Sequence, residues 1–386
     1  MTFEHSPEKI TSSNVLNWPS AAKVAASLAP AGPKLSPAKM RAAVESMRYA
    51  ATASVDHVYN ITGLEAAHNL RDSEVLVVDR ATWAKANTQS FSVMLDPLGE
   101  SVLSKKMQRL TESQRAVATT VGSAELGGVL AFLSTRVLGQ YDPYAALAGH
   151  GAPGGRLMIV APNLLTLEKE LNVDPEDFRL WVCLHEQTHR VQFAAAPWLR
   201  DYMLDLMQQL TKNLGASTDD LLGRALKAAV VTRNATGSEH ESRSEDVVAT
   251  TNIVLGEMAS QTLSQVTAVM SLLEGHANVV MDSVDSSIIP SVRTIRQRFN
   301  RRSETQSFLV KFVSYLLGMK RKMKQYQDGQ KFVQFVVDNE GMDRFNLIWQ
   351  GPENLPTEQE IHDPQAWINR VLYEDEHLDD DPEFLD

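Results

Sequence analysis

The chain contains a single cysteine, Cys183, among its 386 residues, so no disulfide can form within it. The small disulfide-rich scaffolds of secreted domains are therefore excluded, and nothing points to an oxidising compartment. No stretch reaches the roughly 18 consecutive apolar residues that a membrane-spanning helix needs. Residues 1–17 also lack the basic-then-apolar pattern of a secretory signal. We therefore expect a cytoplasmic protein with no membrane partner.

An excess of basic residues is likewise absent. The 37 Lys and Arg face 48 Asp and Glu, which gives a net charge of -11. Because nucleic-acid binders usually carry a basic surface, we expect no nucleic-acid partner. Much of the negative charge lies in residues 374–386, which we predict to be a disordered acidic tail. The apolar fraction of 43% is ordinary for a globular protein and suffices for a sizeable core.

Helical periodicity dominates the rest of the chain. It predicts helices over residues 37–57 and 112–138, and again across most of 199–282 and the C-terminal third. Two short β-branched runs, 75–78 and 157–160, predict buried strands, and residues 139–143 predict a turn. We therefore expect a mainly α (α-rich α+β) fold with a small β-sheet. We see no clean linker, so we predict one domain over 1–373, with a helical N-terminal part (15–110), a catalytic core (111–290) and a helical C-terminal part (291–373).

The most informative helix starts at Asp174. An Asp at the N-cap, Pro175 at the first position and two acids in the first turn form a strong start signal. The helix is predicted to run to about Ala196, since Pro197 stops it. It carries Trp181, Leu184 and other apolar residues on both sides of a short polar motif, which indicates a largely buried helix.

That motif is His-Glu-Gln-Thr-His at 185–189. Two histidines four apart lie on one face of a helix, so both imidazoles can bind one zinc ion, while Glu186 can reach a metal-bound water and act as general base. Chance predicts only about 0.02 copies in a chain of this length. The alternative is a pair of surface histidines without a metal. The helix is apolar on both sides of the motif, however, and burying His185, Glu186 and His189 without partners would cost free energy. The pattern therefore favours a zinc site.

A catalytic zinc needs a third protein ligand, which the motif does not contain. The segment 272–282 is the one that combines a histidine with several other candidate ligands. Glu274 and His276 are rotated by about 200° on a helix, so both cannot easily bind one metal. We favour Glu274 over His276. Asn278 shares a face with Glu274 and is predicted to hydrogen-bond the outer nitrogen of a ligand histidine, with Asp282 as a further residue of the cofactor site.

Other candidates carry weaker signals. Tyr141 and His150 flank the loop before the second strand, and either can donate to an oxyanion in the transition state, so Tyr141 is our second candidate catalytic residue. A plain turn position is the alternative for Tyr141.

Arg190 is expected to form a salt bridge. The arginines between 293 and 302 can bind a substrate carboxylate or a nucleic-acid backbone, but a solvated helix face is the simpler interpretation.

With these residues in place, the chain resembles a family of zincin-like metallopeptidases of Actinobacteria and Chloroflexi whose members are often labelled as associated with the biosynthesis of a deazaflavin coenzyme. The matching stretches are residues 78–87, 138–142, 161–163, 178–193, 197–199, 274–282, 324–332, 352–356 and 367. The resemblance implies a mostly helical zincin-like fold, His185 and His189 as ligands, Glu186 as base and a third ligand near Glu274. It implies no known substrate.

One residue departs from wider zinc-peptidase patterns. An uncharged residue usually follows the second histidine, and here it is Arg190. Three hypotheses therefore stand. The first is a zinc-dependent metallopeptidase that cleaves a peptide or protein substrate, and the second is a catalytically weak zincin-like scaffold that binds Zn²⁺ and acts as a binding or regulatory protein. The third is a helical protein without metal.

Overall fold

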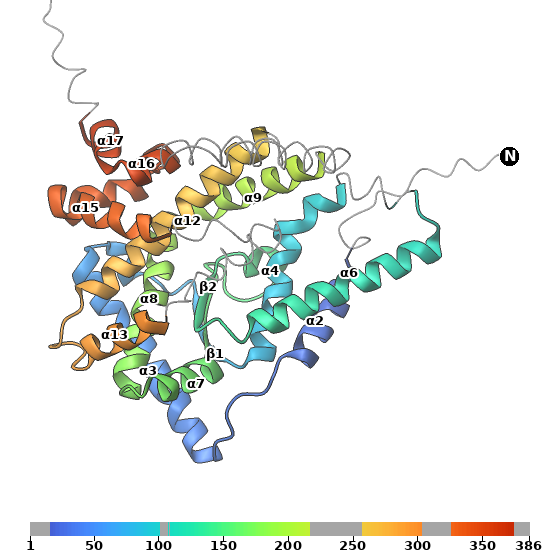
Figure 1. The fold of residues 1–386 in the computed structure, drawn as a ribbon, viewed down its shortest axis with the longest axis horizontal. Helices are drawn as coiled ribbons and strands as arrows, with labels where there is room; N and C mark the ends of the chain where they lie inside the picture. Colours follow the sequence, from blue (N-terminus) through green and yellow to red (C-terminus); the bar gives the residue numbers. More distant parts are fainter. Residues whose placement is uncertain (1–15, 101–106, 108, 217–256, 303–325, 374–386) are drawn as a thin grey trace, which may run out of the picture.

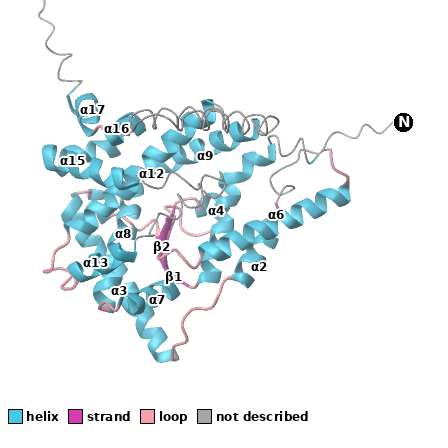
Figure 2. Ribbon diagram, viewed as in Figure 1, coloured by secondary structure: helices cyan, strands magenta, loops and turns pink. Residues whose placement is uncertain are grey.

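The computed structural model describes residues 16–100, 107, 109–216, 257–302 and 326–373. Helices surround a small sheet, as Figures 1 and 2 show, which confirms the expected α-rich α+β fold. The α-helices are α2 (Trp18–Leu28), α3 (Pro37–Thr62), α4 (Arg80–Glu100), α6 (Glu112–Leu133), α7 (Ala161–Leu171), α8 (Pro175–Ala195), α9 (Leu199–Ala216), α12 (Glu257–Ser283), α13 (Val292–Arg302), α15 (Tyr326–Phe345), α16 (Glu358–His362) and α17 (Pro364–Ile368). The strands are β1 (Glu74–Val78), β2 (Gly139–Asp142) and β3 (Arg156–Val160).

The sheet has the order β1-β3-β2. β3 lies in the middle, parallel to β1 and antiparallel to β2, with Val77 opposite Ile159 on one side and Gly139 opposite Ile159 on the other. Every residue of β3 is buried. This burial on both faces explains why the strand reads as an unbroken apolar run in the sequence.

β2 corrects the sequence analysis, which predicted a turn at residues 139–143. The segment contains Gly139 and Asp142 and ends before Pro143, residue types that are depleted in strands. It becomes a strand because β3 pairs with it. The chain reverses direction through residues 143–155 before β3 pairs with β2. The residue preferences of the segment 139–142 alone cannot predict this pairing. Tyr141 therefore lies in an edge strand.

Helix α8 begins where the sequence predicted. The Asp174 side chain accepts hydrogen bonds from the backbone N–H groups of Glu176 and Asp177, both at 3.0 Å, and Pro175 occupies the first helical position. Each feature satisfies or avoids an unpaired N–H at the helix start. α8 packs against α3 on one side and α12 on another, and it contacts β2 and β3. It is therefore the central helix of the molecule.

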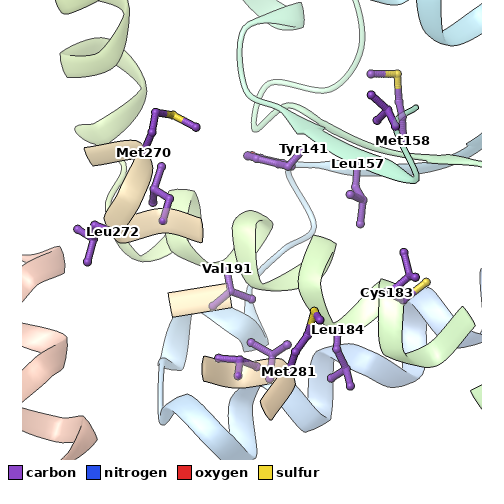
Figure 3. Close-up of a cluster of buried hydrophobic side chains, with 14 of the residues drawn as sticks. Tyr141, Leu157, Met158, Cys183, Leu184, Val191, Met270, Leu272 and Met281 are labelled. Atoms are coloured by element: carbon purple, nitrogen blue, oxygen red, sulfur yellow. The ribbon is translucent and has the colours of Figure 1, made fainter. Parts of the chain in front are cut away.

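The hydrophobic core joins the sheet, α8 and α12. In Figure 3, Leu157 of β3 points from the sheet toward α8, and Leu184 of α8 faces Met281 of α12. Leu157 and Leu184 are fully buried, and Met281 is nearly so. The buried side chains from α2 to the C-terminal helices belong to one cluster. This packing fixes the distance between α8 and α12, the two helices that carry the candidate ligands.

α12 and α15 cross in close contact at two glycines. A Cβ placed on Gly275 would collide with the backbone of Gly329, and a Cβ on Gly329 would collide with the backbone at Ser271. Any side chain at either position would push the helices apart. Gly275 directly follows Glu274, so this crossing also sets the position of that carboxylate.

α6 packs along α2 through Gly127, where a Cβ would lie 2.8 Å from the Ala21 carbonyl oxygen and from the Val24 side chain. By length and composition, α6 is the one helix among the described residues that could cross a membrane, with a third of the relevant window buried. A helix of a soluble protein can meet the same test, so α6 is weak evidence for a membrane.

Two arginines of the basic cluster have structural roles. Arg296 donates to the carbonyls of Met281 and Val284 at the end of α12, and Arg298 donates to the carbonyl of Leu171 at the end of α7. Cations at helix C-termini satisfy unpaired carbonyls and the negative end of the dipole. The part of the predicted helical stretch 199–282 that covers residues 217–256, and the predicted tail at 374–386, lie outside the described residues.

Candidate metal centre and active site

Three of the candidate ligands meet in space. His185 and His189 project from α8, and Glu274 projects from α12, with ligand atoms that lie within 4.8 Å of one another. The two histidine Nε2 atoms are 3.2 Å apart, and each is 3.6 Å from an oxygen of Glu274. Within the described ranges, this is the group of His, Cys, Asp or Glu side chains that could hold a metal ion.

The spacing and chemistry of this group fit zinc. Ligands at about 2.0–2.1 Å from a tetrahedral zinc stand about 3.3 Å apart, close to the separations seen between His185, His189 and Glu274. Two imidazoles with one carboxylate are a donor set that catalytic zinc sites use. The three side chains are partly buried, at 14–20% exposure, so they remain open to the cavity on one side. The residues present can therefore hold the metal that the motif predicts.

Glu186 lies on the adjoining face of α8 and is buried, with 7% of its surface exposed. Burial raises the pKa of its carboxyl to about 7, an effect that His185 opposes and Glu274 reinforces. A carboxyl with a pKa near neutrality can both accept and release a proton under ordinary conditions. This is the behaviour required of a general base that later acts as an acid.

Gly139 of β2 makes room for that carboxyl. A Cβ at Gly139 would lie 2.6 Å from Cγ and Cδ of Glu186 and 2.9 Å from its Oε1. No real Cβ tolerates such contacts, so any side chain there must displace either Glu186 or the strand. The sequence placed Gly139 only in a predicted turn, because its role depends on packing between segments 47 residues apart.

Replacing Gly139 with alanine should lower hydrolytic activity by about 100-fold, because a displacement of about 1 Å in a reacting group can cost that much. Zinc content should not change, since the contacts involve Glu186 and none of the ligands. The matched control is Gly128→Ala on α6, where a Cβ meets nothing within 4 Å. Full activity in Gly139→Ala would show that Glu186 does not need its present position.

The structure places His276 away from the two ligand histidines. It is fully buried, with ring centroids 5.3 Å from Phe345 and 5.4 Å from Trp349, and its Nδ1 lies 3.0 Å from Gln192 Nε2. Burial lowers the pKa of His276 to about 3, with His189 contributing in the same direction. The geometry thus brings Glu274, and not His276, to the motif.

Asn278 and Asp282 line the same cavity as the metal cluster, one and two turns beyond Glu274. Asp282 is exposed, pairs with Arg296 at 3.1 Å and accepts from Gln330 at 2.7 Å. The partner predicted for Asn278, the outer nitrogen of a ligand histidine, is held at His189 by a different residue: Gln192 Oε1 lies 2.9 Å from His189 Nδ1. A cofactor-site role for Asn278 and Asp282 stays a prediction.

Tyr141 also lines the cavity, but its hydroxyl donates to the carbonyl oxygen of Gly154. Its ring packs against Phe193 at 5.4 Å. Burial raises the pKa of Tyr141 to about 12. Donation to an oxyanion would need this hydroxyl to change its partner, so the catalytic role of Tyr141 stays a prediction. His150 is exposed on the loop that follows.

Arg190 is buried, and neutral partners replace its predicted salt bridge, among them Gln187 Oε1 of the motif at 3.4 Å. Its guanidinium donates to Ser73 Oγ and to the carbonyls of Leu70 and Ser73, all at 2.7 Å. It therefore anchors the chain that leads into β1. The charge after the second histidine therefore has a structural explanation.

A cavity of about 1130 Å³ opens over the three candidate ligands and Glu186. All of β2 lines it, together with parts of α4, α8, α12, α13 and α15. Phe193 and Met270, each one helical turn from a candidate ligand, line it, and Phe91, Met94 and Met203 are further apolar lining residues. Polar and charged residues, including Asp282, Arg296, Lys331 and Asp338, lie along other parts of the lining.

Comparison with known proteins agrees with this geometry. A crystal structure from Chloroflexus aurantiacus, described as a presumed hydrolase with a novel fold, is 28% identical and superposes with a TM-score of 0.63, over 93% of this chain and 99% of that one. Among curated proteins, none matches this chain. Residues 16–368 match the family described as zincin-like metallopeptidase. The chain therefore belongs to the zincin-like metallopeptidase family.

Proposed function

We propose that this protein is a zinc-dependent peptidase in which His185, His189 and Glu274 hold the metal and Glu186 transfers the proton. The observation that carries the proposal is the convergence of the three ligand atoms within 4.8 Å beside a buried carboxyl. When bound, zinc supplies a Lewis acid that polarises a carbonyl and lowers the pKa of water.

The protein's own side chains supply the proton transfers. Glu186 takes a proton from the attacking water and delivers it to the nitrogen of the leaving amine, so the carboxyl is regenerated at the end of the cycle. The raised pKa of Glu186, about 7, suits both transfers. Gly139 leaves room for this carboxyl beside β2.

A peptide substrate fits the shape of the site. β2 is one of the two edge strands of the sheet in the described structure, and its four residues all line the cavity. An extended peptide can add to such an edge through backbone hydrogen bonds. The volume of about 1130 Å³ is at or above the upper end of the 300–1,000 Å³ typical of small-molecule pockets. Both features favour a peptide or a flexible protein segment as substrate.

The test is chelation and reconstitution with a diverse library of fluorogenic peptides. Purified protein should contain close to one zinc per chain, lose hydrolysis when zinc is removed and regain it on titration with zinc. Cleavage should favour sites flanked by large apolar residues, because apolar side chains such as Phe193 and Met270 line the cavity. Activity that persists in zinc-free protein would contradict the proposal, and zinc without any hydrolysis would instead identify a metal-stabilised scaffold.

A further inference from the structure

Gln192 lies at the centre of a hydrogen-bond chain behind the candidate metal centre. Its side chain is fully buried, one turn beyond His189 on α8. Its Oε1 lies 2.9 Å from His189 Nδ1, and its Nε2 lies 2.9 Å from the carbonyl oxygen of Leu273 and 3.0 Å from His276 Nδ1. One amide thus connects a candidate ligand on α8 with the backbone of α12 next to Glu274.

The carbonyl oxygen of Leu273 determines which group donates in each of the hydrogen bonds of Gln192. The Leu273 carbonyl can only accept, so the group facing it must be the NH₂ of Gln192 and not its oxygen. Gln192 Oε1 therefore faces His189, and since an amide oxygen only accepts, His189 Nδ1 must carry the proton. In a neutral imidazole the other nitrogen, Nε2, is then unprotonated and points its lone pair at the metal centre.

The second N–H of the Gln192 amide ends at His276. His276 Nδ1 accepts it, which requires the neutral form of the ring with the proton on Nε2. Its Nε2 is buried and has no hydrogen-bond partner among the described residues. Phe345 and Trp349 pack against it. His276 can therefore accept from Gln192 without competing for a metal.

His185 has no corresponding support. Its Nδ1 is buried and has no hydrogen-bond partner in the described part of the chain. Of the two candidate ligand histidines, only His189 therefore has its ring oriented by a hydrogen bond to the nitrogen that faces away from the metal centre, within the described residues. Removal of a partner of this kind from a ligand histidine costs about 10–100-fold in metal affinity.

We propose that Gln192 is a positioning residue that holds His189 in the metal-binding tautomer, with Leu273 and His276 fixing the orientation of its amide. The inference rests on the proposed metal site, and it assigns His276 the role of an internal acceptor in place of a ligand. Neither role could be predicted from the motif, because Gln192 and His189 lie on α8, whereas Leu273 and His276 lie on α12, more than 80 residues further along the chain.

The test compares two glutamines on the same helix. Gln187 is also fully buried, and its amide donates to the Ala51 carbonyl at 2.6 Å, but it contacts neither ligand histidine. The full chain carrying Gln192→Met or Gln187→Met is titrated with Zn²⁺ against a chromophoric chelator, and folding is followed by circular dichroism. Gln192→Met should lose zinc affinity by about 10–100-fold, while Gln187→Met should bind zinc as the wild type does even where its thermal stability falls.

A third variant, His276→Phe, separates an acceptor from a ligand. It keeps an aromatic ring beside Phe345 and Trp349, and Leu273 still orients the Gln192 amide. Its zinc affinity should fall less than that of Gln192→Met. Equal affinity in the Gln192→Met and Gln187→Met proteins would overturn the positioning role and leave the metal site standing. Loss of zinc in His276→Phe greater than in Gln192→Met would overturn the role given to His276, whereas a wild-type protein that binds no zinc would overturn the proposed function itself.

Discussion

Replacing Glu186 with glutamine should lower the rate of peptide hydrolysis by about 10²–10⁴-fold, the usual contribution of a positioned general acid or base. The amide has nearly the shape of the carboxyl and fits the space that Gly139 leaves, but it cannot take a proton from water. Zinc content should remain near one per chain, because His185, His189 and Glu274 are unchanged. The measurements are steady-state kinetics and metal analysis of the same preparation.

The control for this variant is Glu176→Gln. It makes the same change of charge on the same helix, but Glu176 is exposed in the first turn of α8, far from the cavity lining. Its activity should equal that of the wild type. Retention of more than about a tenth of the activity in Glu186→Gln would place the base elsewhere, since the smallest expected loss is about 100-fold. Loss of zinc would mean that Glu186 helps to hold the metal.

Replacing Glu274 with alanine should weaken zinc binding by more than the 10–100-fold expected when only an outer partner is lost. The variant leaves two neutral imidazoles where catalytic zinc sites use three protein ligands. It also removes the negative charge that lies 3.6 Å from both His185 and His189. Hydrolysis should be lost at zinc concentrations that saturate the wild type, and excess zinc should restore little of it.

Asp282→Asn is the matched comparison for this second variant. Asp282 lies two turns further along α12, lines the same cavity and pairs with Arg296. Because its carboxylate is exposed and already bound to Arg296 and Gln330, its neutralisation should lower zinc affinity far less than the loss of Glu274 does. Equal losses of zinc in the two variants would indicate a general electrostatic effect and not a bond from Glu274.

The parts of the site that could be predicted from the sequence are those set by helical periodicity. His185, Glu186 and His189 occupy one helix, so their relation follows from the four-residue spacing and from the start signal at Asp174. The same periodicity shows that Glu274 and His276 cannot easily both bind one metal. The preference for Glu274 rests on Asn278, which shares its helix face and is predicted to support a ligand histidine. The structure brings Glu274 to the motif and turns His276 into the core.

The parts that could not be predicted depend on contacts between distant segments. β2 is a strand only because β3 pairs with it, and Gly139 matters only because α8 brings Glu186 against that strand. Gln192, in place of the predicted Asn278, supports His189 because α12 presents the Leu273 carbonyl and His276 at the right place. These contacts between distant segments cannot be predicted from the residue preferences or the spacing within any one segment.

The most direct test of the metal centre is anomalous diffraction at the zinc absorption edge, on crystals of the protein purified without added metal. The account predicts one strong peak within about 2.0–2.2 Å of His185 Nε2, His189 Nε2 and a carboxylate oxygen of Glu274. A peak bounded by His276 in place of Glu274, or no peak between the two histidines of the motif in protein that hydrolyses peptides, would contradict it.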